Sequence, residues 1–155
     1  MNDDGEISVR LLLNTKTMAL RDMVCRGKCR HRSAEECSTG THIVFLYRGV
    51  YIRHVGRSEA VADANQVVFF NDAESYRISH PVEGGDACIS LSLDESLLRE
   101  VVPEDHVRAG GPLTFVEPRL RIDSQTQTLA AQLRHSLVRE VTEPLEAETM
   151  ALTLV

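Results

Sequence analysis

The feature that most constrains this chain is a change of hydrophobic period near residue 120. Before it, short runs rich in Val, Ile, Phe and Tyr are separated by Gly, Asn and Asp, as in "THIVFLYRGVYIRHVG" and "ACISLSL". Several short strands divided by turn residues are typical of a sandwich or barrel. The run from Val67 to Phe70 is apolar on both faces and predicts a fully buried strand. We therefore expect a mainly β fold, a small antiparallel barrel, over residues 1–120.

Residues 121–155 are expected to form two helices with apolar stripes. The first is predicted to begin at Asp123 or Ser124, and the second after Thr142, where Pro144 suits a first turn. The stripes are Leu129, Leu133, Leu137 and Val138 in the first helix and Leu145, Leu152 and Val155 in the second. We expect one of these faces to pair across a two-fold axis and make a homodimer; the alternative is that both helices fold back onto the barrel.

Length and charge narrow the functional class. The 155 residues suit one domain, and a net charge of −6 argues against this domain itself following a phosphate backbone. The N-terminal run "MNDDGEISVR" is polar, and no segment approaches the roughly 20 apolar residues of a membrane span. We expect a cytoplasmic protein without membrane contact, whose thiols stay reduced.

Three of the four cysteines fall within "CRGKCRHRSAEECSTGTH", residues 25–42, which is expected to be a loop. Thiolates held together could bind zinc or another thiophilic metal ion, and the basic residues between them would offset the negative charge and lower the thiol pKa values. The predicted ligands are Cys25, Cys29 and Cys37, with Cys88, His31 or His42 as the fourth.

Two other interpretations of the cysteines stay open. In one, Cys88 is a small buried hydrophobe on a strand and the other three are incidental loop thiols. In the other, exposed thiols close together form a disulfide under oxidation and act as a redox switch.

The run "HIVFLYRGVYIRHVGRSEAVADANQVVFFNDAESYRISHPVEGGDACISL", residues 42–91, resembles the N-terminal sensor domain of bacterial transcription regulators of the arabinose-regulator (AraC) family. Its most specific part is "VADANQVVFFNDAESYRISHPV". The resemblance implies a cupin-type barrel over residues 1–120 that senses an effector, followed by two C-terminal helices for dimerisation and linkage in residues 121–155. A DNA-binding domain with helix-turn-helix motifs would follow in the parent protein and is absent from this chain.

The resemblance therefore implies a regulatory domain that binds a small molecule or a metal, rather than an enzyme. Within a barrel, aromatic and basic side chains would line the effector pocket, and the arginines would pair with an anionic effector. The candidates are Tyr47, Arg48, Tyr51, Arg53, Tyr76 and His80.

Three alternative functions remain: a stand-alone metal-dependent cupin enzyme, a thiol-based redox sensor and a zinc-stabilised interaction module. Metal-dependent cupins hold their ion through an H-x-H motif with a nearby Glu. The sequence contains no H-x-H, so it does not favour the enzyme.

Overall fold

The computed structural model describes residues 7–27 and 30–155. The strands in these residues are β1 (Ile7–Asn14), β2 (Met18–Cys25), β3 (Glu36–Cys37), β4 (His42–Gly49), β5 (Tyr51–Val55), β6 (Ser58–Ala62), β7 (Gln66–Phe70), β8 (Ser75–Ser79), β9 (Asp86–Leu93) and β10 (Arg119–Arg121). The helices are α1 (Glu95–Val101), the short 3-10 helix η1 (Glu104–His106), α2 (Ser124–Val138) and α3 (Pro144–Thr153).

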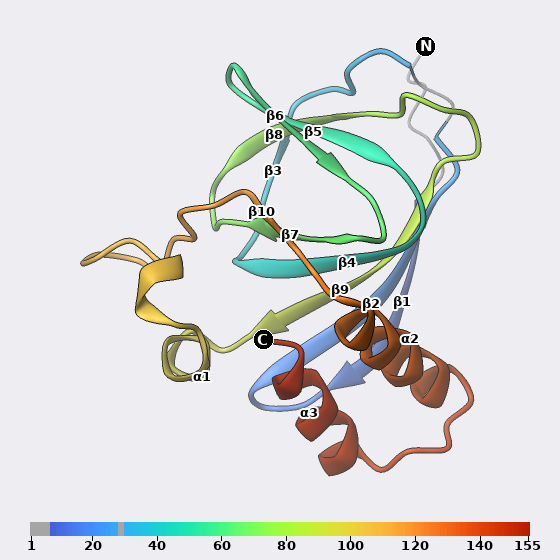
Figure 1. Cartoon of the computed structure of the whole chain (residues 1–155), viewed down its shortest axis with the longest axis vertical. Helices are drawn as coiled ribbons and strands as arrows, with labels where there is room; N and C mark the ends of the chain where they lie inside the picture. The colour runs from blue at the N-terminus through green and yellow to red at the C-terminus, as the bar shows by residue number, and fades with distance from the viewer. Residues whose placement is uncertain (1–6, 28–29) are drawn as a thin grey trace.

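The strands form two antiparallel sheets that face each other across the barrel (Figure 1). One is six-stranded, in the order β1-β2-β9-β4-β7-β10, and the other is four-stranded, in the order β3-β8-β5-β6. Without β1 and β10, the eight remaining strands have the order of a jelly roll, the architecture of cupins. The predicted fold class, a mainly β cupin-type barrel followed by two C-terminal helices, is confirmed.

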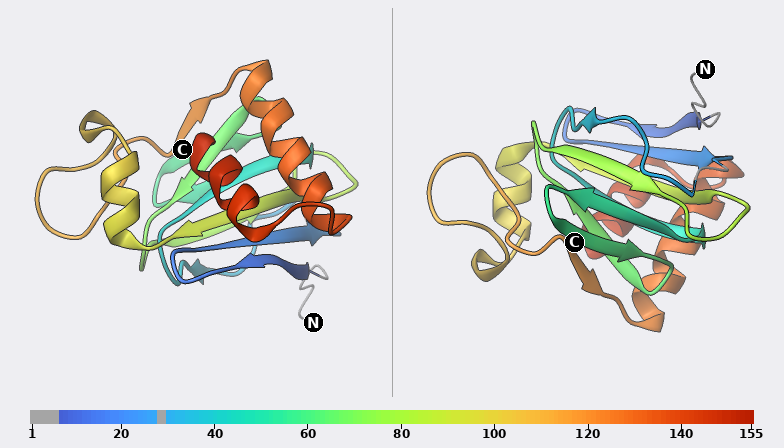
Figure 2. Two further views of the ribbon diagram at one scale, coloured as in Figure 1. Left: turned by 90° about the horizontal axis from the view of Figure 1, so that it is seen from below. Right: turned by 90° about the horizontal axis from the view of Figure 1, so that it is seen from above.

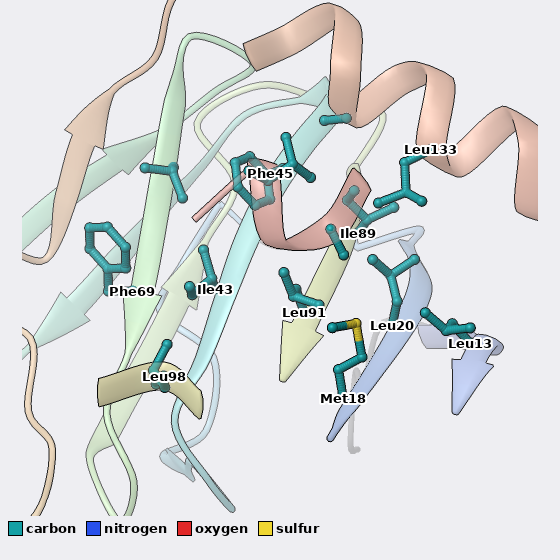
Figure 3. Close-up of a cluster of buried hydrophobic side chains, with 14 of the residues drawn as sticks. Leu13, Met18, Leu20, Ile43, Phe45, Phe69, Ile89, Leu91, Leu98 and Leu133 are labelled. Carbon is teal, nitrogen blue, oxygen red and sulfur yellow. The ribbon is translucent and has the colours of Figure 1, made fainter. Parts of the chain in front are cut away.

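The six-stranded sheet carries the main core on its outer face. Helices α2 and α3 lie across this face (Figure 2), and Leu133 of α2 is fully buried against the sheet. Figure 3 shows Leu20, Ile89 and Leu91 from the strands among the side chains of this core. Burial of such groups supplies about 25 cal/mol per Å² of apolar surface and holds the helices in place.

The inner face of the same sheet lines the barrel. Along β9 the side chains alternate: Ile89 and Leu91 belong to the outer core, whereas Cys88 belongs to a second cluster between the sheets. Val68 and Phe70 of β7 are part of the inner cluster as well, and all of Val67–Phe70 is buried, as predicted. Polar side chains also lie in the barrel interior, and the candidate functional site lies among them.

The helix starts were predicted to within one residue. Asp123 caps α2, and its carboxylate accepts a hydrogen bond from the Thr126 amide at 2.8 Å. The cap of α3 is Glu143 instead of Thr142, because Pro144 takes the first helical position. Strands β1 and β2 and helix α1 were not predicted.

The predicted apolar stripes have different environments. Leu133 and Leu137 are buried against the sheet, which matches the alternative in which the helices complete the core. Leu145 is 74% exposed. Dimerisation stays a prediction, and it would use residues other than Leu133 and Leu137. Within the part of the chain that the structure describes, no helix has the length and apolarity needed to cross a membrane.

Candidate functional site

A cavity of about 650 Å³ opens at one end of the barrel, which we call the open end. It lies where β2 begins and β9 finishes, since Met18 pairs with Leu93 there. The lining combines the basic Arg21 and the acidic Asp72 and Glu95 with aromatic and small polar side chains, among them His42, Tyr76 and Ser90. A concave site with this mixture suits a small polar ligand.

His42 and Tyr76, which line this cavity, both contact the ring of Phe70. The His42 ring stacks on Phe70 at 4.7 Å between centroids, and Tyr76 meets Phe70 edge-on at 5.0 Å. His42 Nδ1 donates a hydrogen bond to the Gly40 carbonyl at 2.9 Å. Burial lowers the pKa of His42, and the charges of Arg53 and Arg21 lower it further. The site therefore favours a neutral imidazole.

Arg53 places a buried positive charge inside the barrel. Its side chain is 2% exposed, lies over the Phe70 ring at 4.4 Å and forms an ion pair with Glu74. Its Nε has no hydrogen-bond partner among the residues that the structure describes. Burial lowers the pKa of Arg53. An unpaired buried donor of this kind is costly, so the interior is suited to an added acceptor.

Two tyrosines add hydroxyl groups to the same interior. Tyr76 donates a hydrogen bond to the Glu36 carboxylate at 3.0 Å, and burial together with that carboxylate raises the pKa of Tyr76 to about 12. Burial raises the pKa of Tyr51 well above its usual value, and Cys88 and Asp86 contribute to the same shift. Both phenols stay protonated, and each can donate a hydrogen bond.

The other end of the barrel, which we call the closed end, gathers Cys25, His80 and Asp86. Cys25 ends β2 and pairs with Asp86 at the start of β9, while His80 directly follows β8. One potential ligand atom from each lies within 4.8 Å of the others. His80 Nε2 and Asp86 Oδ2 are hydrogen-bonded at 2.7 Å. These are the residue types that bind divalent metal ions, and no such trio was predicted from the sequence.

Close backbone approach at glycines shapes the closed end. A Cβ on Gly27 would lie 2.9 Å from the His80 ring and 3.2 Å from Cys25 Sγ. A Cβ on Gly85 would lie 2.0 Å from the Cys25 carbonyl oxygen, and Gly85 has a φ of +65°, which also favours glycine. The three segments that carry the trio therefore approach one another closely at Gly27 and Gly85, and of these two positions Gly85 requires glycine.

Burial also sets the electrostatics of the closed end. It raises the pKa of the Cys25 thiol and of the Asp86 carboxyl, and it raises that of Cys88 far above the usual thiol range. The sequence-based expectation was the opposite, that basic loop residues lower the thiol pKa values. For Cys25, removal from water is the largest effect on the thiol pKa, and the group that lowers this pKa is the Gly27 amide, which donates a hydrogen bond to the sulfur.

The remaining predicted ligands are spread over the molecule. Cys37 is exposed on β3 at the open end, and Cys88 is buried on β9. His31 is exposed in the preceding segment. Cys29 lies outside the described residues. The structure therefore brings none of Cys37, Cys88, His31 or His42 into the trio with Cys25.

Four of the predicted pocket residues, Tyr51, Arg53, Tyr76 and His80, lie in the barrel interior or at its closed end. Tyr47 lies on the opposite face of the sheet, where its hydroxyl donates to Asp22 at 2.7 Å, and Arg48 is exposed. Bulging of β4 between Leu46 and Arg48 changes which side chains point inward there.

A second histidine cluster lies on the four-stranded sheet. His54 Nε2 is 2.8 Å from Ser79 Oγ, and His54 Nδ1 is 3.1 Å from a Glu59 carboxylate oxygen that also pairs with Arg32. The order of groups resembles that of a serine nucleophile with its base and acid, but His54 Nδ1 forms no hydrogen bond with a described residue, so the base is not oriented as a triad requires. Ser79 is only 7% exposed, so a substrate carbonyl has no access to it. We interpret this cluster as structural.

No protein-family model and no curated protein matches the chain. Among solved structures it is similar to a cupin-superfamily protein from Desulfitobacterium hafniense, with 10% identity over 57% of this chain and 77% of that one, at a TM-score of 0.46. It is similar to an RmlC-like cupin from Methanocaldococcus jannaschii, with 10% identity over 64% and 91% of the two chains, at 0.47. A third is the DMSP lyase DddQ from Ruegeria pomeroyi, with 8% identity over 72% and 52%, at 0.48. The fold class rests on the chain's own strand order.

Proposed function

We propose that the chain is an effector-sensing domain of an AraC-type transcription regulator. It binds a small molecule with an anionic group in the open-end cavity and passes the binding event to the C-terminal helices. It acts by binding, without turnover of the ligand. Contact with DNA would belong to a separate helix-turn-helix domain.

The observation that carries the proposal is the position of β2 between the cavity and α2. Arg21 lines the cavity, while the next residue, Asp22, points to the outer face. There the Asp22 carboxylate accepts a hydrogen bond from Arg134 Nε of α2 at 3.1 Å. A ligand that moves Arg21 therefore acts on β2, the strand that is hydrogen-bonded to α2 through Asp22 and Arg134. Such a ligand shifts the helix only if it binds one arrangement of the strand more tightly than the other.

The chemistry of the cavity supports an anionic ligand. Arg21 forms no ion pair with any described residue. His42 and Tyr76 offer flat surfaces, and Ser90 offers a hydroxyl. A guanidinium beside aromatic groups suits a carboxylate or phosphate on a small organic molecule.

The test is a thermal-shift and calorimetric screen with small organic mono- and dicarboxylates and sugar phosphates. We expect at least one to bind saturably, with the affinity reduced at least tenfold by Arg21→Gln. Arg10→Gln, an exposed arginine on the neighbouring strand β1, serves as the control and leaves the affinity unchanged. Equal affinities in both variants would contradict the assignment of the cavity. If NMR showed that the bound compound is chemically changed, this result would instead support the alternative that the chain is a cupin enzyme.

A further inference from the structure

We propose that Cys25, His80 and Asp86 bind one Zn²⁺ ion at the closed end of the barrel. This site differs from the cysteine-rich set that the sequence predicts, and it lies away from the open-end cavity. It therefore goes beyond the sensing function and does not depend on it.

The geometry of the trio needs only a small adjustment. Its three candidate ligand atoms lie within 4.8 Å of one another. Ligand atoms on one tetrahedral Zn²⁺ lie roughly 3.5 Å apart, given bonds of about 2.0 to 2.3 Å. The hydrogen bond between His80 and Asp86, at 2.7 Å, has to open slightly as the ion takes the place of its proton. Side-chain rotation supplies movements of this size without moving the strands.

The donor set matches the preference of zinc. A thiolate, an imidazole and a carboxylate are each ordinary Zn²⁺ ligands, and a hard ion such as Mg²⁺ would not select the thiol. Three protein ligands leave the fourth tetrahedral position for water or another small ligand.

The surroundings of Cys25 favour a metal-bound thiolate. The Gly27 amide donates a hydrogen bond to Cys25 Sγ at 3.4 Å. Outer-shell donors of this kind orient the ligand and tune the metal. The missing Cβ at Gly27 leaves room for the His80 ring and the sulfur side by side. We call this arrangement of the Gly27 backbone against Cys25 and His80 the backbone cradle.

The charge balance points to the same conclusion. Asp86 is buried and Cys25 is partly buried, and their ligand atoms lie within 4.8 Å of each other, so two anions there are poorly solvated without a cation beside them. A divalent ion between the two acidic groups removes this penalty.

The experiment uses the purified chain, reduced and stripped with chelator, and titrates it with Co²⁺ as a spectroscopic substitute for Zn²⁺. We expect one ion per chain, a near-ultraviolet band from thiolate-to-cobalt charge transfer, and displacement by Zn²⁺. Cys25→Ser abolishes the band. His80→Gln and Asp86→Asn each lower the affinity at least 100-fold, since even outer-shell changes cost about 10- to 100-fold. The matched control is Cys37→Ser, which keeps the band.

Gly27→Ala tests the cradle without removing a ligand atom. Its Cβ would meet the His80 ring, so we expect a loss of affinity of about tenfold or more while the metal-free fold, followed by circular dichroism, is unchanged. If Cys25→Ser does not fold, His80→Gln and Gly27→Ala decide the question. Absence of saturable binding, a band that survives Cys25→Ser, or a band lost in Cys37→Ser would overturn the proposal.

Discussion

The two faces of the six-stranded sheet are made by alternate residues of the same strands, yet their chemistry differs. On the outer face, Ile89 and Leu91 join an apolar core that the helices cover. On the inner face, Asp86, Cys88 and Ser90 of the same strand are all buried although two are polar and one is a thiol. The outer face is built for stability, whereas the inner face keeps buried groups that cost stability and suit a ligand or an ion.

The largest effect is expected at the closed end of the inner face, from Gly85→Ala. A Cβ there would overlap the Cys25 carbonyl and strain a backbone with a φ of +65°. We expect the free energy of unfolding to fall by about 4 kcal/mol, measured by denaturant titration.

The control for this substitution is Gly56→Ala, whose φ is +57° but whose Cβ would meet nothing within 4 Å. It carries the backbone strain alone and should cost about 1 kcal/mol. Similar losses at both glycines would show that the close approach of the strands does not matter.

The next effect is expected on the outer face, from Leu133→Ala. Leu133 is fully buried between α2 and the sheet, so truncation leaves a cavity and should cost about 3 kcal/mol. Leu145→Ala, at a position 74% exposed, should change stability by less than about 0.5 kcal/mol. If instead Leu145→Ala lowered the mass seen in equilibrium sedimentation, the predicted dimer would use α3. Equal stability losses at both leucines would contradict the packing of α2 on the sheet.

The smallest effect is a pH dependence at the open end. Unfolded His42 takes up a proton near its usual pKa of about 6.5, whereas burial moves the pKa of folded His42 lower. The unfolded chain therefore binds more protons below that pH, and stability falls as the pH drops through this window. The slope from His42 is at most about 1.4 kcal/mol per pH unit. His42→Phe keeps an aromatic stack on Phe70 and should flatten the slope of the free energy of unfolding between pH 7 and 5. An unchanged slope would show that a group other than His42 causes the pH dependence.

Much of the fold follows from local pattern. The buried run Val67–Phe70 and the Asp123 cap were predicted because each depends on neighbouring residues only. Strand β1 was missed although Ile7, Val9 and Leu11 alternate with polar residues, because it is an edge strand whose apolar positions are about half exposed. Nothing in the local sequence fixes its pairing with β2.

The candidate site was predictable only in part. Arg53 and Tyr76 were expected in the interior, and the structure places them there. The trio at the closed end was not, because Cys25, His80 and Asp86 meet through the pairing of β2 with β9 and the turn after β8. A signal did exist in "HPVEGGDAC", where paired glycines follow a histidine and precede an aspartate. Paired glycines indicate a turn, and a turn by itself gives no reason to connect the segment with Cys25.

The strand order also sets how this chain reaches its folded state. β2 pairs locally with β1, but its other edge pairs along its whole length with β9, so the pairing of that edge waits for a segment made much later. Closing the long loop between two such strands costs conformational entropy before their contacts can offset it. Folds dominated by pairings between strands far apart in the sequence therefore form in about milliseconds to seconds. During synthesis, this edge of β2 stays unpaired until β9 has emerged, and Met18 and Leu20 stay uncovered until the helices that pack on their face follow. Slow folding, and transient exposure of an unpaired strand edge that is prone to aggregation, therefore follow from the topology of the sheet.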